Sequence, residues 1–250
     1  MDFGEGKEMM DAESVEANLR NIIDSSDETE VLQYARQVVN ACGGQWFVFS
    51  SLHPRDQSLE RVTFRFLIGC MPQWCQVYNA HRWYTIDPFL EYALTNTAPI
   101  VGGDMVLRTP GQREIMGAAA NYGFRSIYIV PAHGSGKGRI GLLYIGSDEE
   151  RSEGEKTFSR NRFLLRSLAS ELLDWSSARL KDESIRAFNL DAADLKVLEF
   201  VRDGFTAQQI ATELHQSPSM VYSHFKKITN KIGEKHISGA VRFAAERGFW

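Results

Sequence analysis

The spacing of hydrophobic residues changes along the chain, and each change predicts a different kind of element. Residues 11–42 carry apolar side chains at helical spacing with a break near Ser25, which predicts two helices. The period then falls to two, because Phe47 and Phe49 alternate with other residues and the same alternation recurs in residues 62–68. These later segments are predicted strands, and the helices are expected to cover their sheet.

The middle of the chain returns to helical spacing before two more strands. Residues 73–122 are expected to be mainly helical, with interruptions at Asp87-Pro88 and at a loop from Pro99 to Gly103. Residues 126–132 and 139–145 are predicted strands, and the glycine-rich residues 133–138 are interpreted as the hairpin between them. A phosphate-binding loop is the alternative, but it requires G-x4-G-K-[ST] between a strand and a helix, and that pattern is absent.

A long helix is expected over residues 155–181, with a broad apolar side that Leu164 and Leu173 widen. A helix that is apolar on two flanks is expected to pack on its own domain and on a dimer partner. The polar residues 182–189 after it are interpreted as a linker. The residues predicted to form the dimer contact are Leu165, Leu168, Leu172 and Trp175.

Residues 190–250 carry the start signals of several short helices. Thr206 is an expected N-cap, and Ser217 followed by Pro218 is the strongest helix-start signal in the chain. Two helices joined by about three residues, the second with a polar and basic outer face, are typical of a helix-turn-helix that reads the major groove. The residues expected to contact DNA are Thr206, Ser217, Ser219, Met220, Tyr222, Ser223, Lys226, Lys227 and Lys231.

Charge supports this interpretation only through its distribution. The net charge of −4 argues by itself against a nucleic-acid partner. Residues 217–250, however, hold six Lys and Arg against two Glu, which leaves +4 in this tail and −8 in the rest of the chain. A basic end on an acidic body is expected of a small DNA-binding module, and a solvated helix face is the plainer alternative.

Several other function classes are disfavoured. No run of eighteen apolar residues occurs and the first residues are acidic, so we expect a cytoplasmic protein with no membrane partner. Cys42, Cys70 and Cys75 are odd in number and lack metal-binding spacing, which predicts reduced thiols and no metal. No nucleophile, base and orienting group can be proposed together, so neither an enzyme nor a cofactor is expected.

The C-terminal residues resemble the DNA-binding domain of the LuxR family, which implies a four-helix domain. Asp194 replaces the usual Glu of the motif, Met220 the usual Thr, and Tyr222 a usual Lys. His224 belongs to the motif and can also be interpreted as an imidazole at the edge of the core. The matching residues are Leu190, Asp194, Val197, Leu198, Gly204, Ile210, Ala211, Leu214, Ser217, Val221, His224, Lys231 and Gly233.

The preceding region resembles the acyl-homoserine-lactone-binding domain of quorum-sensing LuxR proteins. The resemblance rests on the run Trp74-x3-Tyr78-x8-Asp87-Pro88, with Gly123 further on. It implies that the Trp74 indole donates to a lactone carbonyl, that Asp87 accepts an amide N–H, and that Tyr78 walls the ring. Such roles suit these groups, because a buried carboxylate needs a hydrogen bond and an indole combines an apolar body with one donor.

Three candidate ligand residues depart from this pattern. Cys70 and Gly102 stand where the family has a ligand-bonding Tyr and a Trp, and Tyr144 stands where a Ser or Thr touches the ligand. Gly102 is therefore expected to leave one wall of the pocket open, and Tyr144 to fill part of it. Either the pocket takes an atypical signal, or Trp74, Tyr78 and Asp87 are fold residues of a domain whose ligand has changed or been lost.

The expected fold class is α+β. An N-terminal αβα sandwich with an antiparallel sheet, residues 1–181, would bind the signal and dimerise; residues 182–189 would link it to a C-terminal all-α helix-turn-helix domain, residues 190–250. The expected function is a homodimeric transcription regulator that binds a two-fold-related operator in DNA under control of a small amphipathic signal, such as an acyl-homoserine lactone. The alternative is a ligand-independent regulator that acts partly by forming heterodimers with related regulators.

Overall fold

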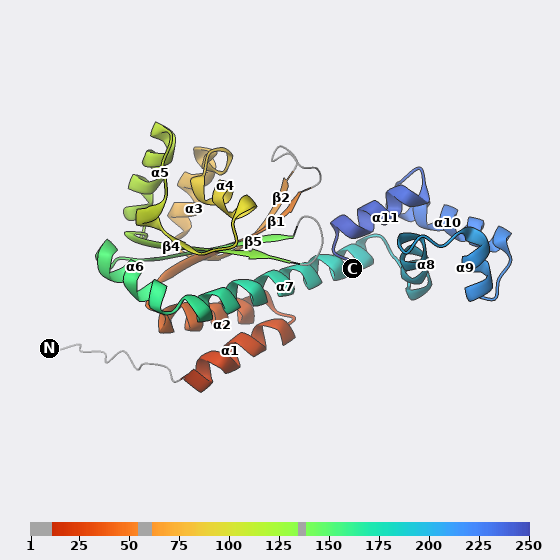
Figure 1. Ribbon diagram of the computed structural model, residues 1–250, viewed down its shortest axis with the longest axis horizontal. Helices are drawn as coiled ribbons and strands as arrows, with labels where there is room; N and C mark the ends of the chain where they lie inside the picture. The colour runs from red at the N-terminus through yellow and green to blue at the C-terminus, as the bar shows by residue number, and fades with distance from the viewer. Residues whose placement is uncertain (1–11, 55–61, 135–138) are drawn as a thin grey trace. The chain divides into compact units, whose positions relative to one another are not determined.

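The computed structural model of the chain describes residues 12–54, 62–134 and 139–250. The chain divides into two compact units, Met1–Trp175 and Ser176–Trp250. The first unit is a five-stranded sheet with helices on both faces, and the second is entirely helical (Figure 1). The predicted α+β fold class is therefore confirmed.

All neighbouring strands of the sheet are antiparallel, in the order β2-β1-β5-β4-β3. The predicted strands are confirmed, and the two-residue β3 adds an edge strand from residues 99–103, which were predicted to be a loop. Gly134 N donates to Arg139 O at 2.9 Å between β4 and β5, as a hairpin requires, although residues 135–138 lie outside the described residues. The strands are β1 Trp46–Pro54, β2 Val62–Gly69, β3 Ile100–Val101, β4 Ser126–His133 and β5 Ile140–Ser147.

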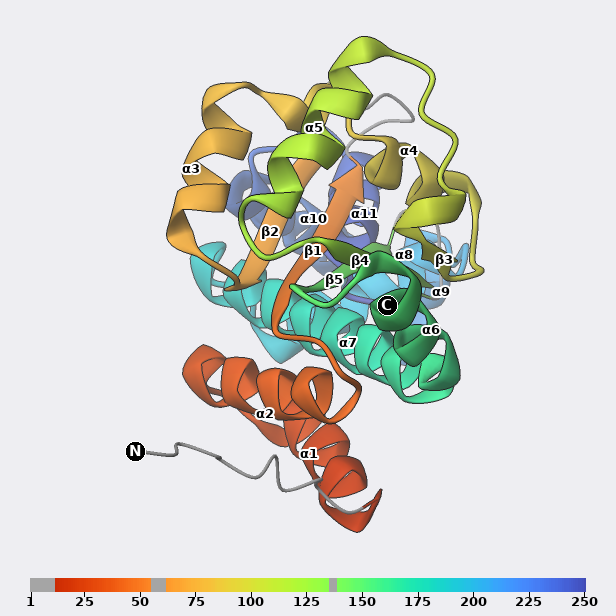
Figure 2. The ribbon, with the colours of Figure 1, turned by 90° about the vertical axis from the view of Figure 1, so that its left-hand side faces the viewer.

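One face of the sheet packs on the N-terminal helices and on the helices that follow β5 (Figures 1 and 2). Phe47 and Phe49 of β1 and Leu143 and Ile145 of β5 point into this core, as strand alternation requires. The helices that contribute to it are α1 Ala12–Asp24, α2 Glu28–Ala41, α6 Arg151–Arg160 and α7 Arg162–Ala187.

Three helices cover the opposite face, and each begins with a proline at its first turn. Proline suits this position because its fixed φ is helical and its missing N–H would have had no partner there. Asp87 and Thr109 cap the second and third of these helices through their side chains. The helices are α3 Pro72–Ala80, α4 Pro88–Thr95 and α5 Pro110–Ala120, with 3-10 turns η2 Trp83–Thr85 and η3 Gly102–Asp104 between them.

The helix predicted over residues 155–181 is in fact two helices, because α6 ends at Arg160 and α7 begins at Arg162. The Asn161 side chain between them donates to Thr157 O at 3.1 Å and so satisfies a carbonyl at the end of α6. Helix α7 then continues to Ala187. Most of the segment interpreted as a linker is therefore helical.

The predicted dimer contact is corrected by burial. All four of the proposed residues lie in the core of the N-terminal unit, where α7 packs under the sheet. Side chains without solvent exposure are not available to a second chain unless the fold opens. On the outer side of α7, Phe163 is 69% exposed and Leu164 36%. The four buried residues are Leu165, Leu168, Leu172 and Trp175.

The C-terminal unit contains four short helices after the end of α7, as the resemblance implied. Gly204 and Gly233, which follow the first and third of them, have φ values of +84° and +82°, a conformation that favours glycine. Among the described residues, none of the helices is long and apolar enough to cross a membrane. The four helices are α8 Ala192–Arg202, α9 Ala207–Glu213, α10 Pro218–Ile232 and α11 Ile237–Glu246.

Candidate functional site

A cavity of about 80 Å³ lies between the sheet and helices α3, α4 and α5. Strand register builds its floor, because Val48 of β1 is opposite both Ile68 of β2 and Tyr144 of β5. Two residues along, Ser50 is likewise opposite Phe66 and Leu142, so all six side chains lie on one sheet face. Phe66 and Ile68 are more than two-fifths exposed, and the cavity is open beside this edge strand.

Helix α3 supplies the aromatic wall of the cavity. Trp74 is 5% exposed, and its ring centroid lies 5.7 Å from those of Tyr78 and Trp83 and 5.9 Å from that of Phe124. Tilted ring pairs at these separations are favourable and hold the indole in one orientation. Trp74 and Tyr78 therefore both line the cavity, as the sequence predicts.

Asp87 also lines the cavity, and its carboxylate is already engaged. Oδ2 accepts a 2.6 Å hydrogen bond from the Tyr78 hydroxyl, and Oδ1 accepts one of 2.8 Å from Phe89 N at the start of α4. Burial raises the pKa of Asp87, and these hydrogen bonds partly offset the rise. A carboxylate oxygen accepts more than one hydrogen bond, so Asp87 can still receive a ligand N–H.

Tyr144 of β5 lines the cavity, and its hydroxyl is buried. The side chain is buried against Phe89 and Phe124, and its hydroxyl makes no hydrogen bond to any residue that the structure describes. Burial raises the pKa of Tyr144 well above its ordinary value near 10, so the hydroxyl stays neutral. A buried polar group without a partner costs free energy, which a ligand with a matching polar atom would recover.

Two predicted ligand residues do not line this cavity. Cys70 is buried in the core beside it, whereas Cys75, which sequence reasoning missed, is in the wall. Cys75, Tyr78 and Asn79 follow helical i, i+3, i+4 spacing, and this signal could have identified Cys75.

Gly102 does not leave a wall of the cavity open. A Cβ at this position would lie 2.8 Å from Ile127 Cβ and 3.2 Å from Glu155 Oε1, so η3 approaches β4 and α6 too closely for a side chain. The prediction that Gly102 shapes the ligand pocket is therefore wrong.

The predicted DNA-binding face is exposed over most of its length. Ser219, Tyr222, Ser223 and Lys226 point to solvent on α10, and Met220 is 56% exposed. Thr206 and Ser217 are exposed too, but their hydroxyls cap α9 and α10 by accepting from Gln209 N and Met220 N. The helix-turn-helix thus presents a polar and basic side of α10, together with two apolar side chains.

Lys231 does not belong to that face. Only 19% of its side chain is exposed, and its ammonium donates to Asn189 O and to Asp194 Oδ2. It holds the recognition helix to the start of α8, so its prediction as a DNA contact is wrong. Lys227 lies 2.9 Å from Asp191 Oδ2 with half of its side chain exposed, and its contact with DNA stays a prediction.

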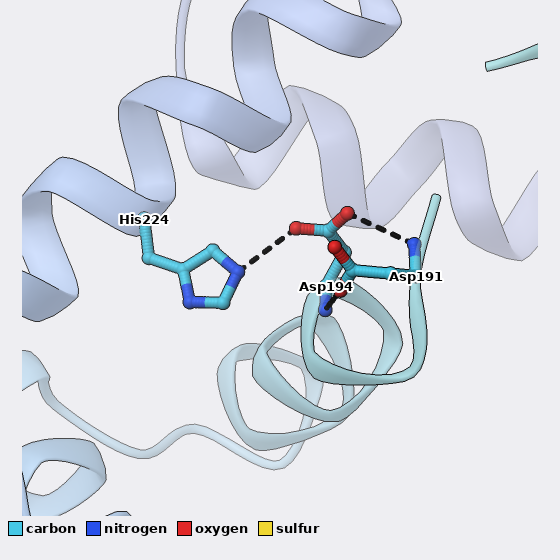
Figure 3. A group of neighbouring side chains, drawn as sticks. All are labelled: Asp191, Asp194 and His224. Carbon is cyan, nitrogen blue, oxygen red and sulfur yellow. Dashed lines mark hydrogen bonds and ion pairs between the residues drawn. The ribbon is translucent and has the colours of Figure 1, made fainter. Parts of the chain in front are cut away.

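Asp194 is the centre of this network (Figure 3). It is fully buried, accepts from Asp191 N at 3.0 Å, and lies 2.8 Å from Nε2 of His224. Burial acts to raise the pKa of Asp194, but the hydrogen bonds from Asp191 N, Lys231 and His224 hold it below its ordinary value. His224 therefore lies at the edge of the core, which agrees with its interpretation as a core-edge imidazole. Asp191, Asp194 and His224 lie close enough for a metal ion, yet two lysine ammonium groups already neutralise the carboxylates.

Comparison with known proteins identifies both units. Residues 27–174 match the family model described as autoinducer binding domain, and residues 190–244 match that of bacterial regulatory proteins, luxR family. The transcriptional activator VanR of Vibrio anguillarum is 25% identical over 213 residues, which cover 84% of this chain and 86% of VanR. The activator AhyR of Aeromonas hydrophila is 25% identical over 221 residues, which cover 82% of this chain and 80% of AhyR.

The fold comparison agrees with these matches. Escherichia coli SdiA, in its complex with octanoyl-rac-glycerol, aligns with a TM-score of 0.65 at 18% identity, covering 96% of this chain and 98% of SdiA. The two models together describe a DNA-binding transcription regulator with an autoinducer-binding domain, and such regulators are transcription factors rather than enzymes. This chain therefore belongs to the LuxR family of bacterial transcription regulators and carries an autoinducer-binding domain before its helix-turn-helix domain.

Proposed function

We propose that this chain is a cytoplasmic, homodimeric regulator whose binding to DNA is controlled by a small amphipathic molecule in the cavity of its N-terminal unit. Its family membership supports transcription regulation, and the ligand named for SdiA is an acylglycerol. The observation that carries the proposal is a pair of polar residues in the largely apolar lining of the cavity. Asp87 offers a carboxylate, and Tyr144 has a buried hydroxyl without a partner among the described residues.

These two groups define the chemistry of the ligand. Asp87 accepts an N–H or O–H, and Tyr144 either donates to a carbonyl or accepts from a donor. The apolar side chains of Phe66 and Ile68, at the open edge, offer a place for an acyl chain. An acylated amide, lactone or glycerol with a polar head and one chain would satisfy these requirements.

The cavity also limits the ligand. Its volume of about 80 Å³ is below the roughly 300–1,000 Å³ of pockets that hold drug-sized molecules. Tyr144 occupies part of the space, and Cys70 offers no hydroxyl there. We therefore expect ordinary homoserine lactones to bind at least tenfold more weakly than a ligand that engages Tyr144. The unmade hydrogen bond costs about 0.5–1.5 kcal/mol, and a buried polar group left unpaired raises the cost to about 1–3 kcal/mol.

A thermal-melt panel on the full chain tests this proposal. Acyl-homoserine lactones of graded chain length and 1-octanoyl-glycerol would be compared on the wild type, Asp87→Asn and Tyr144→Phe. We expect at least one compound to raise the melting temperature by several degrees, with a smaller rise in both variants. A large rise with a common homoserine lactone that Tyr144→Phe leaves unchanged would contradict the role of Tyr144.

The same small cavity supports a second candidate, a ligand-independent regulator that acts partly by heterodimerising with related regulators. If no compound shifts the melting temperature while the purified chain binds its operator, this candidate replaces the first. Substitutions on the exposed face of α10 distinguish the two candidates. We expect them to abolish regulation by a DNA-binding homodimer and to leave regulation by heterodimer formation intact.

Dimerisation and the form of the operator are part of the proposal. A helix-turn-helix monomer reads half a site, so a two-fold-related operator calls for two chains. Phe163 and Leu164 on the outer side of α7 are the exposed apolar residues of that helix that suit an interface. Sedimentation of the full chain, together with gel shifts on whole and half operators, measures both properties.

A further inference from the structure

Two cysteines lie side by side at the wall of the ligand cavity. Cys70 follows the end of β2 and Cys75 lies in α3, and their Sγ atoms are 3.6 Å apart. The third cysteine, Cys42, is buried in the core on the opposite face of the sheet. Cys42 can therefore serve as an internal control for the reactivity of the Cys70 and Cys75 pair.

The two thiols have different surroundings. Cys70 is buried with the core residues under α3, whereas Cys75 is only partly buried and lines the cavity, which is open beside β2. The hydrogen bond between the thiols lowers the pKa of Cys75 to about 7, although burial acts against it, and the same hydrogen bond with burial raises the pKa of Cys70. Since the thiolate is the nucleophile, Cys75 is the sulfur that reacts first.

We propose that Cys75 and Cys70 form a peroxide-reactive thiol pair that closes to a disulfide beside the ligand cavity. The Cys75 thiolate attacks one oxygen of a hydroperoxide, breaks the O–O bond and becomes a sulfenic acid, while the other oxygen leaves as water or an alcohol after taking a proton. The sulfur of Cys70 then displaces the sulfenic oxygen, which leaves as water with the Cys70 proton. Two thiols are oxidised by two electrons, and one peroxide is reduced.

The geometry permits this closure at the cost of a local change. The sulfur atoms must approach from 3.6 Å to about 2.05 Å. Cys70 and Met71 connect β2 to α3, and Met71 makes no side-chain cap at this helix start. The thiol of Cys70 donates to Met71 O at 3.7 Å, and closure exchanges this weak contact for the disulfide. Closure draws the Cys75 sulfur from the cavity wall toward Cys70. Oxidation would therefore change the wall beside Trp74.

Peptide mapping of the full chain tests the proposal. Trypsin cuts after Arg65 and Arg82, so the single peptide 66–82 contains both cysteines, and Cys42 lies in peptide 37–55. After mild hydrogen peroxide and an alkylating agent, peptide 66–82 should have lost two hydrogen atoms and carry no alkyl group. Peptide 37–55 should be alkylated as before, and dithiothreitol should restore both thiols of peptide 66–82.

Single substitutions separate the two roles. Cys75→Ser should slow reaction with peroxide at least tenfold, and Cys70→Ser should stop at a Cys75 sulfenic acid that dimedone traps. Cys42→Ser is the matched control and should behave as the wild type. Met71 lies in the same peptide, so its oxidation to the sulfoxide shows that peroxide has reached this segment. A peptide with oxidised Met71 that still takes two alkyl groups, or a Cys75→Ser chain that reacts as fast as the wild type, would overturn the proposal.

Discussion

The Tyr78 hydroxyl donates a 2.6 Å hydrogen bond to Asp87 Oδ2 and so joins α3 to the first turn of α4. The same carboxylate caps α4 by accepting from Phe89 N. One buried side chain therefore sets the relative position of two walls of the cavity while facing into it. Ligand binding and local stability consequently depend on the same pair of residues.

Tyr78→Phe should lower the free energy of unfolding of the N-terminal unit by about 1.5 kcal/mol. The substitution removes a hydrogen bond to a buried carboxyl group and leaves the aromatic packing in place. Tyr92→Phe is the control, because the Tyr92 hydroxyl bonds Ala98 O at an exposed site and its loss should cost less. Urea denaturation of both variants measures the difference. Equal losses in the free energy of unfolding would mean that the Tyr78–Asp87 hydrogen bond stabilises the fold no more than an exposed one.

Asp87→Asn should flatten the dependence of stability on pH. Because burial raises the folded-state pKa of Asp87 above its ordinary value near 3.8, its contribution is fully present below that value and is lost as pH rises through the folded-state pKa. Asparagine cannot ionise but still caps α4. Melts across the acidic range should show the loss in the wild type and not in the variant; parallel curves would exclude Asp87 as its source.

Asp194→Ala should destabilise the C-terminal unit by about 3 kcal/mol. Asp194 is fully buried and holds Lys231, His224 and Asp191 N, so its removal leaves a largely buried ammonium without its carboxylate. Calorimetry of the full chain would detect the change. As a control, Lys196→Ala breaks only the exposed 3.3 Å pair with Glu199 and should have almost no effect.

Lys226→Ala and Lys231→Ala should have opposite signatures. Lys226 is exposed on α10, so its removal should weaken DNA binding and reduce the salt slope by roughly 0.9 for each phosphate that is no longer neutralised. Lys231 is committed to Asp194 and Asn189, so its removal should lower the melting temperature and leave the salt slope unchanged. Binding isotherms at several salt concentrations decide between them. A changed slope for Lys231→Ala would restore it as a DNA contact.

Phe163→Asp should weaken self-association without unfolding the chain, since Phe163 is exposed on α7. Leu168→Asp should instead cost at least about 3 kcal/mol of stability, because it places a charge in the core under the sheet. Sedimentation and melting curves measured on both variants separate the two effects. If the Leu168→Asp chain were folded and monomeric, the dimer interface would lie on the side of α7 that carries Leu168.

Local patterns were enough to predict most elements of the fold. The alternation through Phe47 and Phe49 predicted a strand, and Ser217-Pro218 predicted the start of the recognition helix, because capping and strand alternation depend on neighbours within a few residues. The Trp74, Tyr78 and Asp87 run was predicted to share a site. These three residues come together because the helix spacing from Trp74 to Tyr78 and the cap at Asp87 are themselves local.

The residues that were misjudged depend on partners far along the chain. Lys231 looks like any basic residue of a recognition helix until Asp194, 37 positions earlier, is folded against it. Gly102 looks like a missing wall until Ile127 and Glu155 are seen to fill the place of its side chain.

The sequence by itself determined the elements of an α+β unit followed by a helix-turn-helix, and its motifs carried the resemblance that implied an αβα sandwich, because periodicity, caps and motif spacing are properties of short segments. Only the tertiary structure decided what covers each apolar or charged side. Leu168 is apolar whether a sheet or a second chain lies on it, and packing alone shows that the sheet does.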